Sequence, residues 1–281
     1  MSLRYDLHCH SLASDGSLAP AELVRAAHAA GVGVLALTDH DTTDGLAEAA
    51  DAARALDLTL VSGAEISVTW QAQTVHVLGL GLDTGNATLQ AGLAGLRTFR
   101  DWRAEEMGRR LARAGIAGAW PGARALAQGR IVSRTHFARY LVAQGHASCV
   151  RDVFRQYLVS NKPGFVAGQW AALEDALSWI RAAGGIAVIA HPARYNMSAS
   201  KLRRLIGEFR ELGGGAMEVV SGSHTRDNVA AMAAVCQREG LLASCGSDYH
   251  GPDNCWIRLG QLPDLPTGCT PVWESERWSL Q

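Results

Sequence analysis

Six short apolar runs along this chain each contain, or close on, a histidine or a carboxylate. The runs are RYDLHCH, VGVLALTDH, LTLVSGAE, TVHVLGL, IAVIAHP and LLASCGSDYH. Helical segments of about ten to fifteen residues separate most of them, which is the pattern of parallel βα units. Because a barrel of parallel strands gathers its strand ends at one face, the polar residues are expected to meet there. The sequence therefore predicts an α/β barrel with a polar site at one end.

The expected elements alternate at both ends of the chain. Strands are predicted at residues 4–10, 32–40, 58–69, 74–82, 186–191, 216–221 and 241–248, and helices at 20–30, 45–56, 173–183, 201–212 and 226–239. A short polar turn around Gln71–Gln73 is expected to join the third and fourth strands. Pro20 at the first helical turn and Gly31 just past the helix end are typical start and stop signals.

The middle of the chain has a different pattern. Between residues 88 and 165 we find helical periodicity, at 93–114, 133–144 and 149–158, but no convincing strand. We therefore expect a barrel built from residues 1–87 and 166–281, interrupted by a helical insertion over 88–165. The insertion is either a substrate cap over the strand ends or a packing appendage without a catalytic part.

Composition excludes several classes of protein. With 281 residues, 48% of them apolar, and a mean hydropathy of +0.01, the chain can bury a large core. A net charge of −1 provides no basic field for long duplex nucleic acid. The six cysteines form no C-x-x-C pair, which argues against a zinc knuckle. We find no apolar signal region and no run of bilayer length, so we expect a cytoplasmic protein without membrane association, and no obligate protein partner is evident.

Nine residues form a candidate metal site. They are His8, His10, Asp15, His40, Glu65, His76, His191, Asp248 and His250. Residues i and i+2 of a strand share a face, so the paired ligands at each end of the chain can reach one ion. Nine nitrogen and oxygen ligands are too many for one ion. A mixed set without cysteine fits hydrolytic Mn²⁺, Fe²⁺ or Zn²⁺ better than structural zinc.

The plain alternative at each position is a hydrogen-bonded histidine of the core or rim. His28 and His146, on expected helices, keep that interpretation, and Asp39 and Asp41 are either turn residues or partners of the ligands. Taken jointly, two i, i+2 pairs and ligands on four other strands favour metal binding. The only lysines, Lys162 and Lys201, do not end strands, so Glu65 is the natural bridging anion rather than a carbamylated lysine.

These motifs resemble the PHP (polymerase and histidinol phosphatase) family. The matching segments are DLHCHS…SDG at residues 6–16, ALTDHD at 36–41, GAEI at 63–66, VHVLG at 75–79, AHP at 190–192 and GSDYH at 246–250. The resemblance implies a distorted (β/α)₇ barrel with two or three divalent metal ions, of which Mn²⁺ is preferred and Fe²⁺ or Zn²⁺ are alternatives. It implies one ion on His8, His10, Glu65 and Asp248, a second on Glu65, His76 and His191, and a third on Asp15, His40 and His250.

Within the family, the chain is most similar to the single-chain subgroup that includes 3′,5′-nucleoside bisphosphate phosphatases and was once labelled tryptophan-operon-associated. The helical insertion supports this, as does the R-x-x-R-A helix at Arg100–Ala104. A third similarity is the R-P-H-I/F-A-R segment at Arg134–Arg139, in which Thr135 replaces the usual proline. That replacement removes a backbone constraint beside Arg134.

The resemblance implies a phosphatase that removes the 3′-phosphate from nucleoside 3′,5′-bisphosphates. Catalytic roles are expected for Glu65, Asp248 and His224, and substrate contacts for Arg100, Arg103, Arg134, His136, Lys162, Arg194 and His224. For each arginine, a solvated helix face is the plain alternative. Three other functions stay open: a 5′→3′ exoribonuclease on short RNA, a histidinol-phosphatase-like phosphomonoesterase, and a non-catalytic module whose metals only hold the fold.

Overall fold

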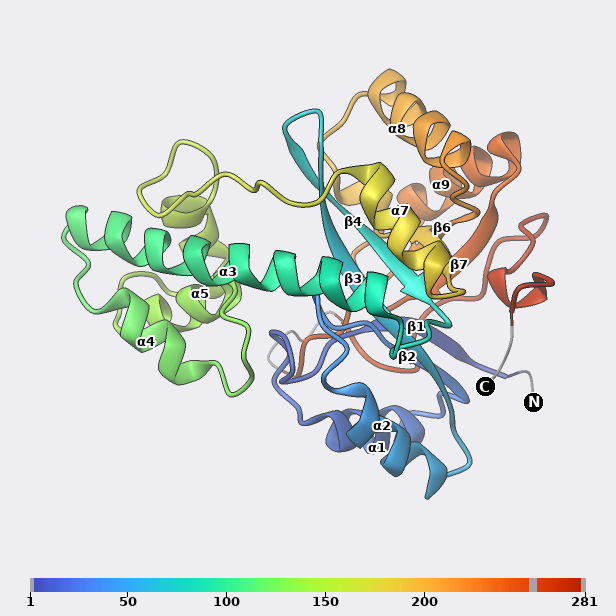
Figure 1. Ribbon diagram of the computed structural model, residues 1–281, viewed down its shortest axis with the longest axis horizontal. Helices are drawn as coiled ribbons and strands as arrows, with labels where there is room; N and C mark the ends of the chain where they lie inside the picture. The colour runs from blue at the N-terminus through green and yellow to red at the C-terminus, as the bar shows by residue number, and fades with distance from the viewer. Residues whose placement is uncertain (1–2, 253–256, 279–281) are drawn as a thin grey trace.

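Seven strands form a nearly closed barrel in the computed structural model, which describes residues 3–252 and 257–278 (Figure 1). In chain order, which is also their order in the sheet, they are β1 Tyr5–Cys9, β2 Val34–Leu37, β3 Thr59–Trp70, β4 Gln73–Leu80, β5 Ile186–Ile189, β6 Ala216–Ser221 and β7 Leu242–Gly246. The amide of His10 donates to the carbonyl of Tyr249 just beyond β7, which brings the last strand against the first. The structure confirms the predicted α/β barrel.

One strand runs against the expected direction. Strand β4 pairs antiparallel with both β3 and β5, whereas the other pairs in the sheet are parallel. The two-residue turn between β3 and β4 has positive φ at both Gln71 and Ala72, as in a type I′ hairpin, and such a turn reverses the chain. A uniform series of parallel βα units is therefore wrong for this part, because the hairpin replaces one crossover helix.

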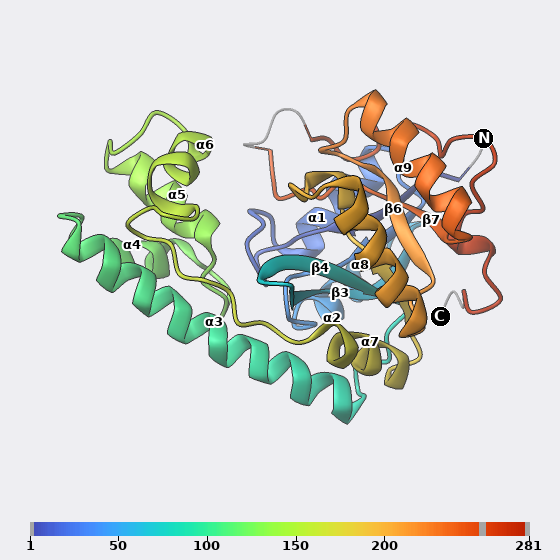
Figure 2. The same cartoon turned by 90° about the horizontal axis from the view of Figure 1, so that it is seen from above.

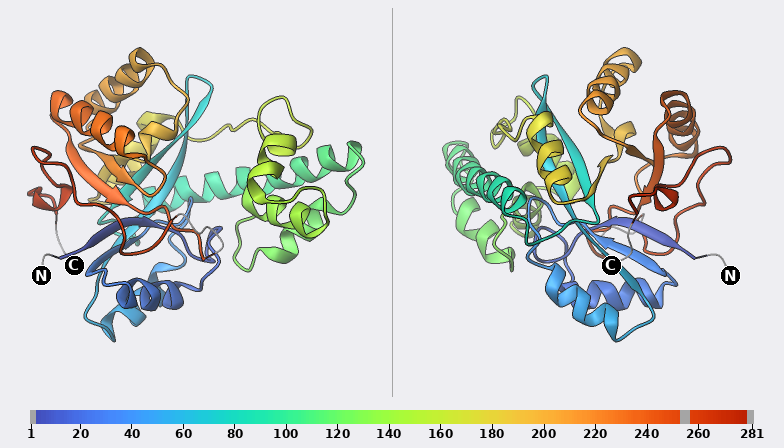
Figure 3. Two further views of the ribbon diagram at one scale, coloured as in Figure 1. Left: turned by 180° about the vertical axis from the view of Figure 1, so that it is seen from behind. Right: turned by 45° about the vertical axis from the view of Figure 1, so that its right-hand side comes forward.

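Five helices pack outside the barrel, where their apolar faces cover the strands (Figures 1 and 3). They are α1 Pro20–Ala29, α2 Leu46–Arg54, α7 Leu173–Ala182, α8 Ala199–Glu211 and α9 Arg226–Glu239. Leu205, Ile206 and Phe209 show how one face of α8 enters the core, because these positions on one helix face are all essentially inaccessible. The predicted helices at these positions are confirmed within a few residues.

The residues between β4 and α7 form a helical body beside the barrel (Figure 2). It contains α3 Ala87–Arg113, α4 Ala119–Leu126, α5 Arg134–Ala143, α6 Val150–Val153 and a π-helical turn at Phe154–Leu158. No strand occurs within residues 88–165, all of which the structure describes. Helix α4 was not expected, and α3 begins six residues earlier than the predicted 93–114, because the Asn86 side chain accepts from the amide of Leu89 and caps it.

Helix α3 belongs to two cores. Leu89, Leu93 and Leu96 pack in the main barrel core, whereas Met107 and Leu111 pack with α4, α5 and the π-helical turn in a separate cluster. The long helix therefore ties the insertion to the barrel as one continuous rod. A domain boundary near residue 88 remains a proposal. Such a boundary would separate the first part of α3 from the barrel core against which this part of the helix packs.

Candidate active site

The nine candidate ligands converge at one end of the barrel, around a cavity of about 170 Å³. Seven of them line this cavity, and His8 and His10 are fully buried behind these. Asp15, His40, His191, Asp248 and His250 lie in loops that follow strands. The convergence is the geometry expected of a barrel whose functional groups sit at strand ends.

Glu65 and His76 differ from the expected placement because they lie inside strands. Strands β3 and β4 extend beyond the barrel as a hairpin, in which Ser67 pairs with His76 and Glu65 with Leu78. Cross-strand pairs share a face of the sheet, and so do residues i and i+2 of one strand. Glu65 and His76 are therefore on the same face, although β4 runs in the opposite direction.

The Glu65 carboxylate lies at the centre of the cluster. Its Oε1 is 2.8 Å from His76 Nδ1 and 3.1 Å from His191 Nε2. Its Oε2 is 2.9 Å from His40 Nδ1, 3.3 Å from His10 Nε2 and 3.4 Å from His8 Nε2. One carboxylate thus presents one oxygen to each of two groups of imidazoles, which is the arrangement of a carboxylate that bridges two cations.

Two hydrogen bonds orient the imidazoles from outside the cluster. His8 Nδ1 donates to Glu218 Oε1 at 2.8 Å, and His250 Nδ1 donates to the carbonyl of Asp248 at 2.9 Å. In both rings the remaining Nε2 faces the other candidate ligands. Such bonds set the tautomer and the ring orientation of metal-binding histidines.

Several buried atoms of the cluster have no hydrogen-bond partner among the described residues. They include Asp15 Oδ1, Glu65 Oε2, His10 Nδ1, His40 Nδ1, His76 Nδ1 and His191 Nδ1. Buried polar groups are normally satisfied, so such a concentration calls for an explanation. Three sets of three or four ligand atoms, each mutually within 4.8 Å, are formed here: His10–Asp15–His40–His250, His8–His10–Glu65 and His40–Glu65–His76. The residues present therefore fit divalent cations.

The grouping of ligands differs in more than one respect from the pattern implied by the resemblance. His10 joins the group of Asp15, His40 and His250, and His40 is also grouped with Glu65 and His76. His40 contacts both candidate positions: its Nδ1 lies near Glu65, and its Nε2 lies 3.8 Å from Asp15 Oδ1. The resemblance implies that His40 binds only the ion assigned to Asp15 and His250. Because β2 ends directly before the loop that carries His40, the ring of His40 lies between Asp15 and Glu65. It can therefore act as a ligand in either group.

The carboxylates of the site are held ionised and stabilise positively charged groups beside them. Burial alone would raise the pKa of Glu65, but the rings of His40, His76 and His8 hold it well below its usual range. Burial likewise opposes the shift at His10, whose pKa is nevertheless raised to about 10 by Asp248 and Glu65. Burial lowers the pKa of His40 to about 4, against the attraction of Glu65 and Asp15. The ionised Glu65 and the neutral His40 have the protonation states that metal binding requires, whereas His10 must lose its proton when a cation binds.

Three of the six non-glycine residues with positive φ among the described residues lie in loops that carry the ligands. Asp41, His191 and Asp248 have φ values of 51°, 30° and 56°, a region that side chains other than glycine rarely adopt. Gly246, just before the last of these, could not carry a Cβ atom, which would lie 2.2 Å from Cβ of His8. Strained conformations persist where surrounding contacts over-determine them, and they cluster at functional sites.

The insertion contributes directly to the loop that carries Asp15. Asp15 Oδ2 accepts from Ser133 Oγ at 2.9 Å and from Thr135 Oγ1 at 3.0 Å, at the start of α5. On the other side of the loop, Asp39 accepts from the hydroxyls of Ser11 and Ser14. The hydroxyl of Thr135 thus provides an anchor that a proline at this position would lack.

Three arginines of the insertion line the cavity beside the carboxylates. Arg100 is paired with Asp41, since its Nε lies 2.6 Å from Oδ2 of that residue, and its Nη2 donates to Ser67 Oγ. Arg103 donates Nε to the carbonyl of Val166. Within the part of the chain that the structure describes, neither Arg103 nor Arg134 forms an ion pair.

The positive charge of these arginines is therefore only partly balanced. Burial, reinforced by the charges of Arg134 and Arg100, lowers the pKa of Arg103. Burial and the nearby Arg100 act in the same direction on the pKa of Arg134. Groups that repel one another in a partly buried site are stabilised by an anion, and guanidinium groups suit phosphate through paired N–H donors. The guanidinium groups on this side of the cavity therefore suit an anion.

Comparison with known proteins identifies the family. Residues 6–211, more than half of the chain, match the family described as PHP domain. The chain belongs to the PHP family. This confirms the resemblance carried by the strand-end motifs, and the candidate metal cluster of the structure is formed by the residues of those motifs.

PHP relatives cover nearly the whole chain. A 3′,5′-nucleoside bisphosphate phosphatase of Chromobacterium violaceum is 49% identical over 95% of this chain and 94% of its own length. A 5′-3′ exoribonuclease of Haemophilus influenzae is 45% identical over 98% and 99%. A solved structure from C. violaceum, described as an amidohydrolase with bound sulfate and no metal, has a TM-score of 0.93 at 48% identity over 96% and 95%. A Bifidobacterium adolescentis structure, described as a metal-dependent phosphoesterase, has a TM-score of 0.79 at 27% identity over 97% and 94%.

Three residues expected to contact substrate do not line the cavity of this PHP site. His136 Nδ1 instead accepts from the amide of Ser133 and caps α5. Lys162 is exposed in the return segment. His224 Nδ1 donates to the carbonyl of Val219 within its own loop. By contrast, Arg194 lines the cavity, where its Nη1 pairs with Asp248 Oδ2.

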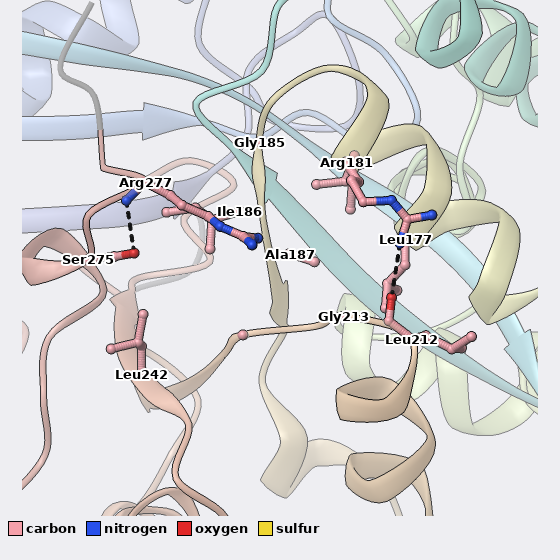
Figure 4. Close-up of a pocket in the computed structure, with 12 residues that line it drawn as sticks. Leu177, Arg181, Gly185, Ile186, Ala187, Leu212, Gly213, Leu242, Ser275 and Arg277 are labelled. Atoms are coloured by element: carbon pink, nitrogen blue, oxygen red, sulfur yellow. Dashed lines mark hydrogen bonds between the residues drawn. The ribbon is translucent and has the colours of Figure 1, made fainter.

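A second hollow of about 260 Å³ lies at the opposite strand ends (Figure 4). The starts of β5, β6 and β7 form its apolar wall, and Arg181 and Arg277 stand at its edge. Arg181 donates to the carbonyl of Leu212. None of the nine candidate ligands lines this hollow, so the chemistry of the PHP site belongs to the smaller cavity.

Sequence reasoning missed Glu218. It is fully buried in the apolar strand β6, and besides orienting His8 it accepts from the amide of His191. A carboxylate in the middle of a buried strand is a recognisable signal, because such a charge persists only with partners. Sequence reasoning also missed Ser67, which lies two residues after Glu65. Because residues i and i+2 of a strand share a face, this spacing was a weaker signal that Ser67 lies at the site.

Proposed function

We propose that this chain is a metal-dependent phosphatase that converts nucleoside 3′,5′-bisphosphates into nucleoside 5′-monophosphates and phosphate. The observation that carries the proposal is a single cavity with two chemically distinct sides. One side holds the histidines and carboxylates around Glu65, and the other holds Arg100, Arg103 and Arg134. A substrate with two phosphate groups fits both sides at once.

The metal side would hold two or three divalent ions. We assign one to His8, His10, Glu65 and Asp248, a second to Glu65, His76 and His191, and a third to Asp15, His40 and His250. Imidazole together with carboxylate suits Mn²⁺, with Fe²⁺ or Zn²⁺ as alternatives. When bound, such ions supply an activated water and stabilise charge on phosphoryl oxygens.

The chain itself positions the substrate. The guanidinium groups of Arg103 and Arg134 would bind the 5′-phosphate, and Arg100 would contribute the N–H donors that its two protein partners leave free. Binding energy gained at a phosphate that does not react can be used to orient the one that does. Arg194, which pairs with Asp248, would contact the reacting phosphate. We assign no proton transfer to His224, because it does not line the cavity.

A 5′→3′ exoribonuclease activity on short RNA is a second candidate. The relative from H. influenzae carries that name and matches almost the full length of this chain. A phosphodiester at the 3′ oxygen presents nearly the same reacting group as a 3′-phosphate. The same arginines would then hold the 5′-phosphate of an oligonucleotide.

No helix among the described residues has the length and apolar character needed to span a membrane.

The proposal is tested with the Mn²⁺-loaded protein by measuring phosphate release from the phosphomonoesters. Release of mononucleotides, measured by chromatography, is the readout for RNA, because hydrolysis of a phosphodiester frees no inorganic phosphate. The substrates are adenosine 3′,5′-bisphosphate, adenosine 3′-monophosphate, adenosine 5′-monophosphate, histidinol phosphate and short 5′-phosphorylated RNA. We expect the highest kcat/KM for the bisphosphate, about 10- to 100-fold above the 3′-monophosphate, because charge-assisted hydrogen bonds contribute about 1.5–3 kcal/mol. Equal rates for these two would overturn the two-phosphate site.

Arginine variants show which side chains carry the preference. Arg134→Gln should lower kcat/KM for the bisphosphate and leave the 3′-monophosphate nearly unchanged. Arg109→Gln is the matched control, because Arg109 lies on the exposed side of α3 and pairs with Glu106 there. Preferential cleavage of RNA by the unaltered protein would instead favour the exoribonuclease.

A further inference from the structure

Two aromatic side chains line a cavity that is otherwise made of charged and polar groups. They are Phe154, at the start of the π-helical turn, and Trp170, just before α7. Neither binds metal nor pairs with phosphate. A flat apolar ring that protein groups leave partly exposed can stack on the third part of a nucleotide, its base.

Trp170 is already surrounded. The guanidinium carbons of Arg100 and Arg103 lie 5.0 and 5.3 Å from its ring centre, and Phe99 packs edge-on with centroids 4.8 Å apart. Its Nε1 donates to Thr74 Oγ1 at 3.1 Å. Trp170 therefore serves as the wall against which the arginines are ordered.

Phe154 packs against the insertion core as one of its partly buried side chains. Its carbonyl accepts from the amide of Val159, which closes the π-helical turn, and the neighbouring Val153 and Leu158 are buried in the insertion core. The ring is partly exposed, and the guanidinium carbon of Arg134 lies 5.5 Å from its centre. Single π-helical turns are rare in proteins, and those that occur are often found at functional sites. Here the turn presents a flat apolar surface beside the arginine proposed to hold the second phosphate.

Each of the four hydroxyl groups that line the cavity is already engaged by a protein group, although Ser67 and Thr74, which accept, keep an O–H donor. Ser133 and Thr135 both donate to Asp15, Ser67 accepts from Arg100, and Thr74 accepts from Trp170. Hydrogen bonds to base edges are what distinguish one base from another, whereas stacking tolerates every base because each has a π-face. The lining thus favours stacking over base-specific recognition.

We propose that Phe154 is the stacking surface for the substrate's base and that the enzyme accepts nucleoside 3′,5′-bisphosphates with little regard to which base they carry. This inference rests on the proposed function and specifies its substrate class. The base lies against Phe154, the 5′-phosphate lies on the adjacent arginines, and the 3′-phosphate faces Glu65. A base-free sugar bisphosphate satisfies both phosphate sites but lacks this contact.

The test compares adenosine 3′,5′-bisphosphate with the 3,5-bisphosphate of 1-deoxyribose, which has no base. We expect kcat/KM of the unaltered Mn²⁺-loaded protein to be about tenfold or more higher for the nucleotide, since base stacking on an aromatic ring contributes about 1–3 kcal/mol. Phe154→Leu should reduce that ratio to about one, while Phe154→Tyr and Phe154→Trp should keep it. Cytidine, guanosine and uridine bisphosphates should react within a few-fold of one another.

Tyr157→Leu is the matched control, because Tyr157 lies in the same turn but contacts His146 and does not line the cavity. Equilibrium binding of both compounds gives the same comparison without turnover. If the ratio stays high in Phe154→Leu, or is near one in the unaltered protein, the stacking role is wrong although the phosphatase function stands. If neither bisphosphate is hydrolysed, the proposed function is wrong, and the binding ratio still decides the role of Phe154.

Discussion

Asp41 Oδ2 lies 2.6 Å from Arg100 Nε, and this buried ion pair joins the loop after β2 to helix α3 of the insertion. Asp41 directly follows His40, and its Oδ1 accepts from the amide of Ser67, two residues after Glu65. Arg97 donates to its carbonyl from the preceding turn of α3. One aspartate therefore connects the candidate metal ligands of the barrel to the arginines proposed to bind phosphate.

Asp41→Asn should weaken that connection. We expect KM for adenosine 3′,5′-bisphosphate to rise about tenfold or more, with a smaller change in kcat and unchanged metal content, because Arg100 loses its charged partner. Urea unfolding should also show reduced stability, since breaking a buried pair leaves an uncompensated charge. Asp44→Asn, at an exposed position three residues later, is the control. An unaltered KM would separate Asp41 from substrate binding.

Glu65→Gln removes the charge shared by five imidazoles. We expect almost complete loss of phosphate release and a lower content of bound metal, because an amide is a weak metal ligand and cannot bridge as a carboxylate does. Circular dichroism should report an intact fold. Metal content is measured by elemental analysis after Mn²⁺ loading and dialysis, with the exposed Glu211→Gln as control. Full activity without any bound or activating metal would contradict the proposed centre.

Glu218→Gln tests the support behind the ligands. His8 Nδ1 keeps an acceptor only if the amide oxygen faces it, and the amide of His191 then meets an N–H group instead of a carboxylate oxygen. We expect Mn²⁺ affinity to fall about 10- to 100-fold, the usual effect of losing such a partner. Activity should recover at high Mn²⁺ concentration. Identical Mn²⁺ titration curves for both proteins would show that Glu218 does not influence metal binding.

His136 makes the stability of the fold sensitive to acid. Burial lowers its pKa from 6.5 to about 4, against a weaker opposing effect of Asp15, and its Nδ1 must stay unprotonated to cap α5. Because the fold favours the neutral ring, its contribution is fully present above pH 6.5 and is lost as the pH falls toward 4. The loss approaches about 3 kcal/mol, taking 1.36 kcal/mol per pKa unit.

The corresponding variant is His136→Gln, which keeps an acceptor at the capping position but does not titrate. Urea unfolding in EDTA at pH 7.5 and pH 5 should show a smaller difference for this variant than for the unaltered protein. His28→Gln, on the exposed side of α1, should behave like the unaltered protein. Equal acid sensitivity of all three would exclude His136 as the cause.

Local pattern determined much of the barrel and its chemistry. Short continuous apolar runs indicate strands buried on both faces, and the HCH segment predicts two potential ligands on one face of a strand. The same prediction for the SDYH segment is wrong, because β7 ends at Gly246 and both potential ligands lie in the loop that follows. The scarcity of lysine made Glu65 the expected bridging anion, and the structure places it between two groups of imidazoles. These features follow from neighbours within one segment, so they are readable without the fold.

Tertiary structure decided what depends on partners far apart in the chain. Strand β4 pairs with β5, more than a hundred residues away, and Glu218 acts on His8 across 210 positions. Arg100 and His136 look alike as candidate substrate contacts in the sequence, yet one lines the cavity while paired with Asp41 and the other caps a helix. A side chain's role depends on which polar groups lie within hydrogen-bonding distance of it in the folded chain. Only long-range packing determines those neighbours.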